Sequence, residues 1–404
     1  TCIDIVYQEW KTKQKSILLD HLMAEILSGG TDCLVAYRGM HRWIELFESI
    51  RLPDCNEVPS LLKENGVYLI TGGFGGIGFE IAKYLAESLK AKLILSGRSM
   101  LPAREEWEEW LAGHSEEDST RNKIKKLQEL ENLGVEVLNI TADVTDEEDM
   151  AKCRVAIEEK YGRIDGIVHA AGIAGGGMIQ LKTKAVADAV MEPKVKGTEV
   201  IWSVFKDSGL DFIVLCSSST AVIHSFGQVD YCSANAFLDA FASYHDGRGK
   251  PLVMSINWDA WKEVGMAVDT RQPESLKEQV RTQLKKFGIS SDEGVDAFAR
   301  IMDAKPQRIL TSTRPFKIEK VSPRRAEESV KAETPVSRKY DRPQLLSEYS
   351  EPVGSTEKTI ADIWQDSLSI STSGRHDKFF ESGGNALLGI QRIATIKELL
   401  NVSI

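Results

Sequence analysis

Short apolar runs alternate with helix-like stretches through the middle of the chain. The apolar runs lack polar alternation, which is typical of strands that are covered on both faces. Helical stretches such as 79–89 and 235–244 separate them. We therefore predict an α/β fold over residues 66–316, built on a doubly wound parallel sheet. The predicted strands are 67–71, 92–96, 136–141, 165–170, 212–217, 252–258 and 308–312.

The regions on either side of this alternation have different patterns. Residues 1–65 predict two strands, at 3–10 and 33–47, around a helix at 17–27. A region of that length is too short for an independent core of any depth. Residues 317–350 are rich in Lys, Glu, Ser and Pro, which is typical of a linker.

The last region, residues 351–404, becomes helical again. Its pattern predicts an amphipathic helix at 357–368, a loop at 379–385 and a second helix at 386–400. We therefore expect a small and incomplete helical domain after the linker. Within the α/β region, the heavily charged segment 105–132 is interpreted as a solvated surface helix.

Composition excludes several classes of function. The 404 residues suggest two to three domains, and 42% hydrophobic with 27% charged residues are ordinary globular values. A net charge of -10 argues against a nucleic-acid partner. The six cysteines form no CxxC pair and no ligand spacing with histidine, so neither a disulfide scaffold nor a metal site is expected.

No apolar run reaches the roughly 18 residues of a membrane helix, and no signal peptide is evident. We expect a cytoplasmic protein, cut from a longer chain because it begins with Thr1.

A glycine-rich turn follows the first strand of the α/β region and opens a helix. Such a turn lets backbone N–H groups approach a pyrophosphate at the helix N-terminus. The strand before it and the helix after it are the context that this motif requires, so we predict a dinucleotide site. The alternative is a turn that merely needs glycines. The predicted contact residues are Thr71, Gly72, Gly73, Phe74, Gly75, Gly76, Ile77 and Gly78.

The ends of the next strands complete this predicted site. The second strand runs into Ser96, Arg98 and Ser99, where a site that prefers NAD usually carries an acidic residue. An arginine suits a 2′-phosphate, so Arg98 points to NADPH, the alternative being an ordinary solvated arginine. After the third strand, Asp143 and Val144 are placed to meet the adenine.

The fourth and fifth strands end in candidate residues for the reacting side of the cofactor. Ala170, Ala171 and Gly172 are placed to line the nicotinamide, and His169 is interpreted as a structural histidine. The fifth strand runs into Ser218, and Tyr231 follows thirteen residues later. Reduction of a ketone by hydride needs a proton donor for the developing alkoxide. A tyrosine serves if a nearby ammonium lowers its pKa, while a serine hydroxyl holds the carbonyl oxygen.

The glycine turn, the serine thirteen residues before the tyrosine and the helix that follows resemble the short-chain dehydrogenase/reductase family, which has a Rossmann fold. That family usually carries Tyr-x-x-x-Lys, but position 235 is Asn. The ketoreductase domains of modular polyketide synthases and hybrid nonribosomal peptide synthetases instead take their lysine from an earlier helix, here Lys194 in 193–197. The segments 231–239 and 257–266 are similar to that group, and the resemblance covers residues 3–316.

The resemblance implies a role for each of four residues. Tyr231 would donate the proton and Ser218 would orient the carbonyl. Lys194 would lower the pKa of the tyrosine and contact the ribose, and Asn235 would complete a polar relay. Tyr244 is interpreted as a helix packing residue. The open alternatives are Lys196 in place of Lys194, and Ser217 or Ser219 in place of Ser218.

Three departures from the family pattern concern the fold and the product. The structural subdomain before the catalytic half is much shorter here, at residues 1–65. The segment 171–178 lacks the Leu-Asp-Asp motif that accompanies one product configuration, and Ile223 stands where a tryptophan accompanies the other. These motifs therefore do not predict the product configuration. The glycine-rich 174–178 is also similar to ketoreductases embedded in peptide synthetases, some of which reduce α-keto rather than β-keto groups.

The segment 377–388 resembles the thiolation motif of acyl and peptidyl carrier proteins, and 357–368 with Trp364 resembles their first helix. The family's serine carries phosphopantetheine, but position 386 is Ala386, which has no hydroxyl for that attachment. We interpret Ala386 as an engineered change from serine or as a naturally inactive carrier.

These features together predict NADPH-dependent reduction of an α- or β-keto group on a carrier-tethered acyl or peptidyl thioester, next to other synthase domains. A non-catalytic docking domain and a free-standing carbonyl reductase are the alternatives. The four site residues argue against the first, and the carrier-like tail argues against the second.

Overall fold

The structure is a computed structural model that describes residues 2–5, 12–27, 32, 34–38, 41–55, 57–177, 179, 182–223, 227–269, 274–314, 342, 349–368, 370–379 and 396. The chain divides into two compact units, one formed by Ile50–Pro315 and the other by Thr1–Ser49 with Phe316–Ile404. The larger unit contains the predicted α/β region.

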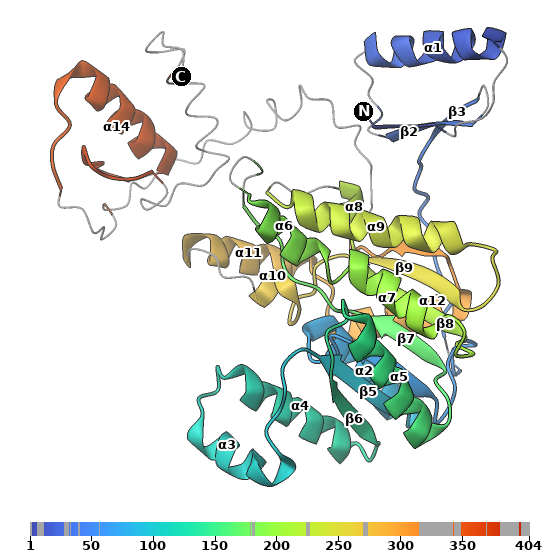
Figure 1. Cartoon of the computed structure of the whole chain (residues 1–404). Helices are drawn as coiled ribbons and strands as arrows, with labels where there is room; N and C mark the ends of the chain where they lie inside the picture. Colours follow the sequence, from blue (N-terminus) through green and yellow to red (C-terminus); the bar gives the residue numbers. More distant parts are fainter. Residues whose placement is uncertain are drawn as a thin grey trace. The chain divides into compact units, whose positions relative to one another are not determined.

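The larger unit is built on a seven-stranded parallel sheet with the strand order β10-β9-β8-β7-β4-β5-β6 (Figure 1). The chain runs outward from β4 to β6 and then returns to β7, on the other side of β4. The carboxyl ends of β4 and β7 therefore form a topological switch point, which is where open α/β sheets bind ligands. The strands are β4 (Val67–Thr71), β5 (Lys92–Gly97), β6 (Val137–Thr141), β7 (Gly166–His169), β8 (Phe212–Ser218), β9 (Leu252–Trp258) and β10 (Arg308–Leu310).

Helices cover both faces of this sheet. On one face, α2, α4 and α12 share a hydrophobic cluster with Tyr68 and Ile70 of β4. On the other face, α5, α7 and α9 share a second cluster with Val67 and Leu69. Successive residues of β4 thus enter two different cores, which explains its uninterrupted apolar sequence. The helices are α2 (Gly76–Leu89), η1 (Arg104–Glu106), α3 (Trp107–Gly113), α4 (Ser119–Asn132), α5 (Glu147–Tyr161), α6 (Lys184–Met191), α7 (Val195–Phe205), α8 (Thr220–Ile223), α9 (Val229–His245), α10 (Met266–Asp269), α11 (Glu274–Phe287) and α12 (Ser291–Ala304).

The seven predicted strands are confirmed, each within two residues of its expected ends. The prediction of one helix over 105–132 is wrong, because the segment forms η1, α3 and a separate helix α4. Asp118 begins α4 by accepting a hydrogen bond from the Arg121 N–H at 2.7 Å. Although α4 is highly charged, its Ile124, Leu127 and Leu130 are buried, so the helix contributes to the core.

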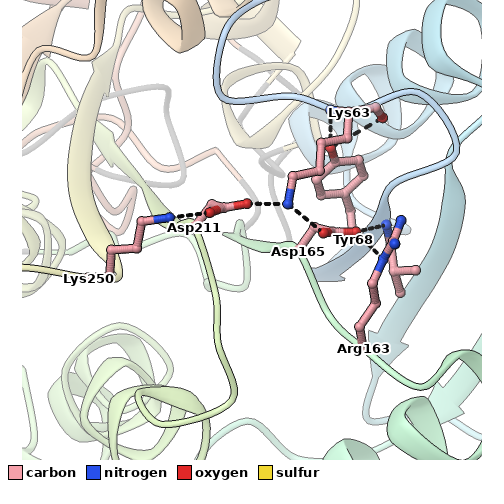
Figure 2. A network of polar contacts seen from close by, with 7 residues as sticks. Lys63, Tyr68, Arg163, Asp165, Asp211 and Lys250 are labelled. Carbon is pink, nitrogen blue, oxygen red and sulfur yellow. Dashed lines mark hydrogen bonds and ion pairs between the residues drawn. The ribbon is translucent and has the colours of Figure 1, made fainter.

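A polar network joins the amino ends of the central strands (Figure 2). Asp165, directly before β7, accepts hydrogen bonds from the Val67 N–H at 2.8 Å and from Lys63 Nζ at 2.9 Å. The same Lys63 Nζ lies 2.5 Å from Asp211, directly before β8, and Lys250 Nζ lies 2.6 Å from Asp211. The network therefore fastens β4, β7 and β8 at the edge of the sheet opposite the switch point.

In the smaller unit, the N-terminal residues form a three-stranded sheet in the order β1-β2-β3. Strand β1 (Cys2–Ile5) precedes helix α1 (Thr12–Leu27) and pairs in parallel with β2 (Leu34–Arg38). The prediction of a single strand at 33–47 is wrong, because β2 pairs antiparallel with β3 (His41–Ile44). Apolar residues continue from β2 into β3, which ends in Trp43 and Ile44, so hydrophobicity alone suggested one strand.

The C-terminal part of the smaller unit contains helix α14 (Gly354–Leu368), which confirms the helix predicted at 357–368. Trp364 packs edge-on against Phe379, with ring centroids 5.2 Å apart. The predicted loop at 379–385 beyond its first residue, the helix at 386–400 apart from Ile396, and Ala386 lie outside the described residues, as does most of the predicted linker.

Within the described ranges, no helix is both long and apolar enough to cross a membrane. The same residues contain no cluster of three or more His, Cys, Asp or Glu side chains that could hold a metal ion.

Candidate active site

The glycine turn lies at the switch point, between the end of β4 and the start of α2. Gly72 has a φ of +68°, and a Cβ there would lie 2.7 Å from the Ala171 Cα, so only glycine fits. A Cβ on Gly76 would lie 2.3 Å from the backbone nitrogen of Gly265. Gly75 caps α2 without a side-chain hydrogen bond, so the first N–H groups of the helix lack intrahelical partners. This close-packed backbone with free donors suits a phosphate group.

Two cavities open beside this turn. The larger, of about 620 Å³, is bounded by the turn, the end of β8, the start of α9 and the segment after β9. The smaller, of about 250 Å³, lies over the ends of β4, β5 and β6. Predicted residues that line the larger cavity are Gly72, Gly75, Gly76, Ile77, Gly78, Ala170, Ala171, Gly172, Lys194, Ser218 and Tyr231. Those that line the smaller cavity are Thr71, Gly72, Ser96, Arg98, Asp143, Val144, Ala171 and Gly172.

Four predicted residues line neither cavity. Gly73 packs against Leu95, where a Cβ would lie 2.7 Å from the leucine Cδ2. Phe74 packs on the hydrophobic cluster that contains α2, and Ser99 is exposed. Asn235 is fully buried behind Tyr231. Gly73 and Phe74 thus shape the turn, while Asn235 reaches the site through its hydrogen bonds.

His169 is a buried structural residue, which confirms its interpretation from the sequence. Burial, and then the charge of Lys194, lower the pKa of His169 to about 3, so the ring is neutral. Its Nε2 lies 3.0 Å from the Pro193 carbonyl, which can only accept, so Nε2 carries the proton. Its Nδ1 then accepts from the Thr71 hydroxyl at 2.7 Å. His169 therefore links the glycine turn to the residue before Lys194.

Arg98 and Asp143 face the smaller cavity in different ways. Arg98 is exposed at its edge, and no ion pair to it is found among the described residues. One carboxylate oxygen of Asp143 is already hydrogen-bonded within the chain. It accepts from the N–H and the hydroxyl of Thr145 at 2.9 and 2.8 Å. Arg98 is thus available to an anionic ligand, while Asp143 shapes the turn after β6.

The hydroxyl of Ser218 is oriented by Thr220. Ser218 Oγ accepts the Thr220 N–H at 3.2 Å and the Thr220 hydroxyl at 3.0 Å. A serine oxygen has two acceptor positions, so these bonds leave Ser218 its own proton to donate. The Ser218 side chain also lowers the pKa of Tyr231, which indicates that the two hydroxyl groups lie close together.

Tyr231 holds its proton more firmly than the sequence predicted. Burial raises the pKa of Tyr231, and hydrogen bonds from Asn235 and Ser218 only partly oppose it. Lys194 Nζ lies 5.9 Å from the centre of the tyrosine ring and donates to the Cys216 carbonyl at 2.7 Å. Burial lowers the pKa of Lys194 itself to about 8. The expected net lowering of the tyrosine pKa is therefore not observed, because burial outweighs the groups that favour the ionised form.

Asn235 connects the active-site helix to its surroundings. Its Nδ2 donates to the Tyr231 carbonyl at 2.7 Å, and its backbone carbonyl accepts from Ser217 Oγ at 3.2 Å. Its Oδ1 is buried and has no hydrogen-bond partner among the described residues. Because a buried acceptor without a partner is costly, this oxygen is suited to receive a proton donor from a water molecule or a ligand.

A buried polar network supports the serine from behind. Its members Asp239 and Asn257 lie in the segments 231–239 and 257–266 singled out from the sequence, but no role had been predicted for them. Asn257 Nδ2 donates to the Ser218 carbonyl at 3.2 Å and to Asp239 at 2.7 Å. Asp239 also accepts from Ser255 at 2.6 Å and pairs with Arg308 at 3.1 Å. The network joins α9 to β8, β9 and β10, so it fixes the end of β8 relative to the helix that carries Tyr231.

The alternatives left open by the sequence differ from the main candidates in position. Ser217 and Ser219 also line the larger cavity, but their hydroxyl groups have other partners. Ser217 Oγ is engaged with Asn235 and Asn257, and Ser219 Oγ donates to Asp259 at 3.4 Å. Lys196 is exposed and lines neither cavity. Tyr244 was expected to pack in its helix but is 61% exposed.

Several lining residues were not predicted. They come from the segment after β9 and from the start of α9, and the signal available for the first group was the motif at 257–266. The residues are Gln228, Trp258, Asp259, Ala260, Trp261, Val264, Gly265 and Met266.

Comparison with known proteins identifies this arrangement. Residues 66–263 match the family model described as KR domain. Polyketide synthase PksM of Bacillus subtilis (strain 168) is 33% identical over 276 residues, which are 68% of this chain and 6% of that protein. The chain thus spans a small part of this curated relative.

Solved structures agree with this match. An N-terminal ketoreductase from a macrolactin assembly line is 30% identical with a TM-score of 0.58, covering 77% of this chain and 55% of that one. A ketoreductase domain from a bacillaene assembly line is 28% identical with a TM-score of 0.61, covering 77% and 68%.

Proposed function

Since residues 66–263 belong to the KR domain family and carry the fold of assembly-line ketoreductases, we propose that this chain reduces a keto group of a carrier-tethered acyl or peptidyl thioester with NADPH. The observation that carries the proposal is the arrangement of three polar side chains around one cavity. Ser218, Tyr231 and Lys194 line the same cavity of about 620 Å³ as the glycine turn.

The residues around the two cavities fit a dinucleotide. A Cβ on Gly72 or Gly76 would fill the space at the turn, and the free N–H groups of α2 suit a pyrophosphate. When bound, NADPH supplies a hydride to the carbonyl carbon. Arg98 would receive the 2′-phosphate at the smaller cavity, which is the basis for proposing NADPH rather than NADH.

The chain's own residues would supply the proton. The Ser218 hydroxyl, held as a donor by Thr220, would orient the carbonyl oxygen of the substrate. Tyr231 would give its phenol proton to that oxygen as negative charge develops there. Protonated Lys194 would stabilise the resulting tyrosinate, and Oδ1 of Asn235 would hold a water that relays a proton from the solvent back to the tyrosinate.

We also propose that the chain works next to a carrier and other synthase domains. The relatives are polyketide synthases, of which this chain matches a small part. The segment 377–388 resembles a thiolation motif, and Trp364 of the preceding helix packs on Phe379. Ala386 stands at the attachment position, so the acyl chain would arrive on a different carrier.

The proposal is tested by following NADPH consumption with two substrates. We expect a keto-acyl pantetheine thioester to give a higher kcat/KM than a simple ketone, and NADPH to outperform NADH. No turnover of either substrate would indicate a non-catalytic domain, and equal or better use of the simple ketone would indicate a free-standing carbonyl reductase. Equal kcat/KM with both cofactors would contradict the role of Arg98.

A further inference from the structure

A buried ion pair lies directly beside Tyr231 and has no part in the proposed proton transfer. Lys182 Nζ donates to Asp230 Oδ2, and the two side chains are 7% and 1% exposed. Asp230 lies in the first turn of α9, immediately before Tyr231, and its Oδ1 accepts the Tyr231 N–H at 2.9 Å. Both carboxylate oxygens are therefore engaged, one with the start of the active-site helix and one with Lys182.

Part of the chain between β7 and α6 lies close to Tyr231. A Cβ on Gly175 would lie 2.7 Å from the Tyr231 Cβ and 2.8 Å from Asp230 Oδ1. Ala174 and Gly175 both line the larger cavity. Further along, a Cβ on Gly227 would lie 3.5 Å from the Gly177 carbonyl oxygen. Residues 174–177, called the crossing segment below, thus form part of the cavity wall and touch the beginning of α9.

The ion pair involves Lys182, which lies five residues beyond the crossing segment and at the start of α6. Lys182 stands directly before Thr183, which caps α6 by accepting the Val186 N–H at 3.3 Å. The pair thus ties the start of α6 to the start of α9. Removing two charges from water is costly, and an apolar pair would hold the helices as well. A charged pair adds a defined geometry, because the carboxylate must meet Lys182 and the Tyr231 N–H at the same time.

We propose that the Lys182–Asp230 pair is a positioning device for ketone reduction. It holds the crossing segment against Tyr231, and so sets both the orientation of the phenol and the width of the cavity where the acyl chain enters. Lys182 and Asp230 are positioning residues, and Gly175 limits which acyl groups fit beside the tyrosine. This inference rests on the proposed ketoreductase function.

Three variants separate positioning from simple structural support. Lys182→Met leaves a buried carboxylate without its partner, and Asp230→Asn leaves a buried ammonium, so both single variants should lower Tm. The double variant Lys182→Met/Asp230→Asn has no unpaired charge, and the side-chain amide oxygen introduced at position 230 would still accept the Tyr231 N–H. We expect its Tm to return towards the parent value, while kcat stays about 10- to 100-fold lower, the usual effect of a small misplacement in an active site.

The substrate dependence gives a second readout. With the crossing segment released, the ratio of kcat/KM for the acyl-pantetheine thioester over a simple ketone should fall, while the KM for NADPH should stay at the parent value. The control is Lys184→Met/Asp188→Asn, which removes a nearby ion pair whose side chains are 88% and 40% exposed. This control should match the parent in all kinetic values.

Hydrogen exchange tests the pair without any turnover. In the double variant, the amides of residues 174–177 and of Tyr231 should exchange faster than in the parent, and those of β4 should be unchanged. An inactive parent would refute the proposed function. The exchange result would then still show whether the Lys182–Asp230 pair holds the crossing segment against α9. A double variant with parental kcat, parental substrate ratio and parental exchange would overturn the inference.

Discussion

The phenol of Tyr231 is the first place to test the chemistry at the scale of single residues. Replacement by phenylalanine removes only the hydroxyl, so the fold and cofactor binding should survive. Because a general acid contributes about 10²–10⁴-fold, we expect kcat of Tyr231→Phe to fall by that factor. Steady-state kinetics with a keto-acyl thioester, together with NADPH titration by fluorescence, measures both effects.

The matched control is Tyr244→Phe, since Tyr244 lies in the same helix but is 61% exposed. It should behave as the parent. If Tyr231→Phe keeps a near-parental kcat, another residue donates the proton.

Thr220 acts through the proton of Ser218. Thr220→Val removes the hydroxyl that donates to Ser218 Oγ and keeps both the branched shape and the backbone N–H. One neutral hydrogen bond contributes about 0.5–1.5 kcal/mol, so we expect kcat to fall by about 2- to 12-fold. Thr220→Ser, which restores a hydroxyl, should recover most of the loss. Equal kcat in the valine and serine variants would show that the hydroxyl has no such role.

The charge of Lys194 sets the expected pH dependence. Burial lowers its pKa from 10.5 to about 8, so the ammonium loses its proton as pH rises through about 8. The raised pKa of Tyr231 keeps the phenol protonated over that range. We therefore expect kcat/KM to decline above about pH 8. Lys194→Arg keeps its charge there and should lack this decline, although its overall rate should be lower.

The same pKa shift gives the opposite trend for stability. The folded state holds fewer protons than the unfolded chain between about pH 8 and 10.5, so the contribution of Lys194 to the free energy of unfolding rises with pH in that window. For the kinetic prediction, a kcat/KM profile that is flat from pH 7 to 10 in the parent would contradict the dependence of the rate on the charge of Lys194.

At this scale the sequence predicted which residues line the site better than it predicted their pKa values and their partners. The motif spacing correctly placed Ser218 and Tyr231 in one cavity, because Ser218 ends β8 and Tyr231 lies in the first turn of α9. It could not predict the direction of the tyrosine pKa shift, which depends on burial by residues distant in sequence. The contact of Lys182 with Asp230 crosses 48 positions and carries no local signal.

At the scale of whole elements, we predict that the polar network at the amino ends of the strands stabilises the packing of β4, β7 and β8. Asp165 is 6% exposed on its side chain and receives hydrogen bonds from Val67 and Lys63. Asp165→Asn should lower the free energy of unfolding by about 1.5–3 kcal/mol, the usual value of hydrogen bonds to a charged group. Urea unfolding followed by circular dichroism measures this. The kinetic constants should not change, because the network lies at the edge of the sheet opposite the cavities.

Lys250→Met is the control for this network. The Lys250 side chain is 75% exposed, so its ion pair with Asp211 should contribute less than about 1 kcal/mol. A loss in Asp165→Asn no larger than in Lys250→Met would show that the network does not fasten the strands.

Elements were predictable where burial is two-sided. Most strands of the central sheet are mainly apolar because successive residues enter different cores, and all seven appear where expected. The two errors concern segments in which a second element begins within the predicted one. Strand β3 pairs antiparallel with β2 inside the predicted strand 33–47, and Asp118 begins α4 inside the predicted helix 105–132.

At the scale of the whole chain, the carrier-like tail makes a prediction that depends on one missing oxygen. Phosphopantetheine transfer needs a hydroxyl at the attachment position, and Ala386 has none. A promiscuous phosphopantetheinyl transferase with coenzyme A should therefore leave the intact mass of the chain unchanged. Ser382 lies four residues earlier, in the predicted loop, and should not substitute.

Intact mass spectrometry before and after incubation checks this prediction, with Ala386→Ser as the variant that restores the hydroxyl. A gain of one phosphopantetheine on the parent would show that the motif has been assigned to the wrong residues. The tail remains a prediction from sequence, because Ala386 lies outside the described residues.

The state of His169 has a consequence for how the site responds to its surroundings. With a pKa of about 3, the ring stays neutral from weakly acidic to alkaline solution, and its two hydrogen bonds keep one direction, from Thr71 through the ring to the Pro193 carbonyl. Histidine is ordinarily the side chain that responds to physiological acidification. Here it stays a neutral dipole of fixed direction, so His169 itself adds no charge beside the glycine turn when the solution becomes weakly acidic.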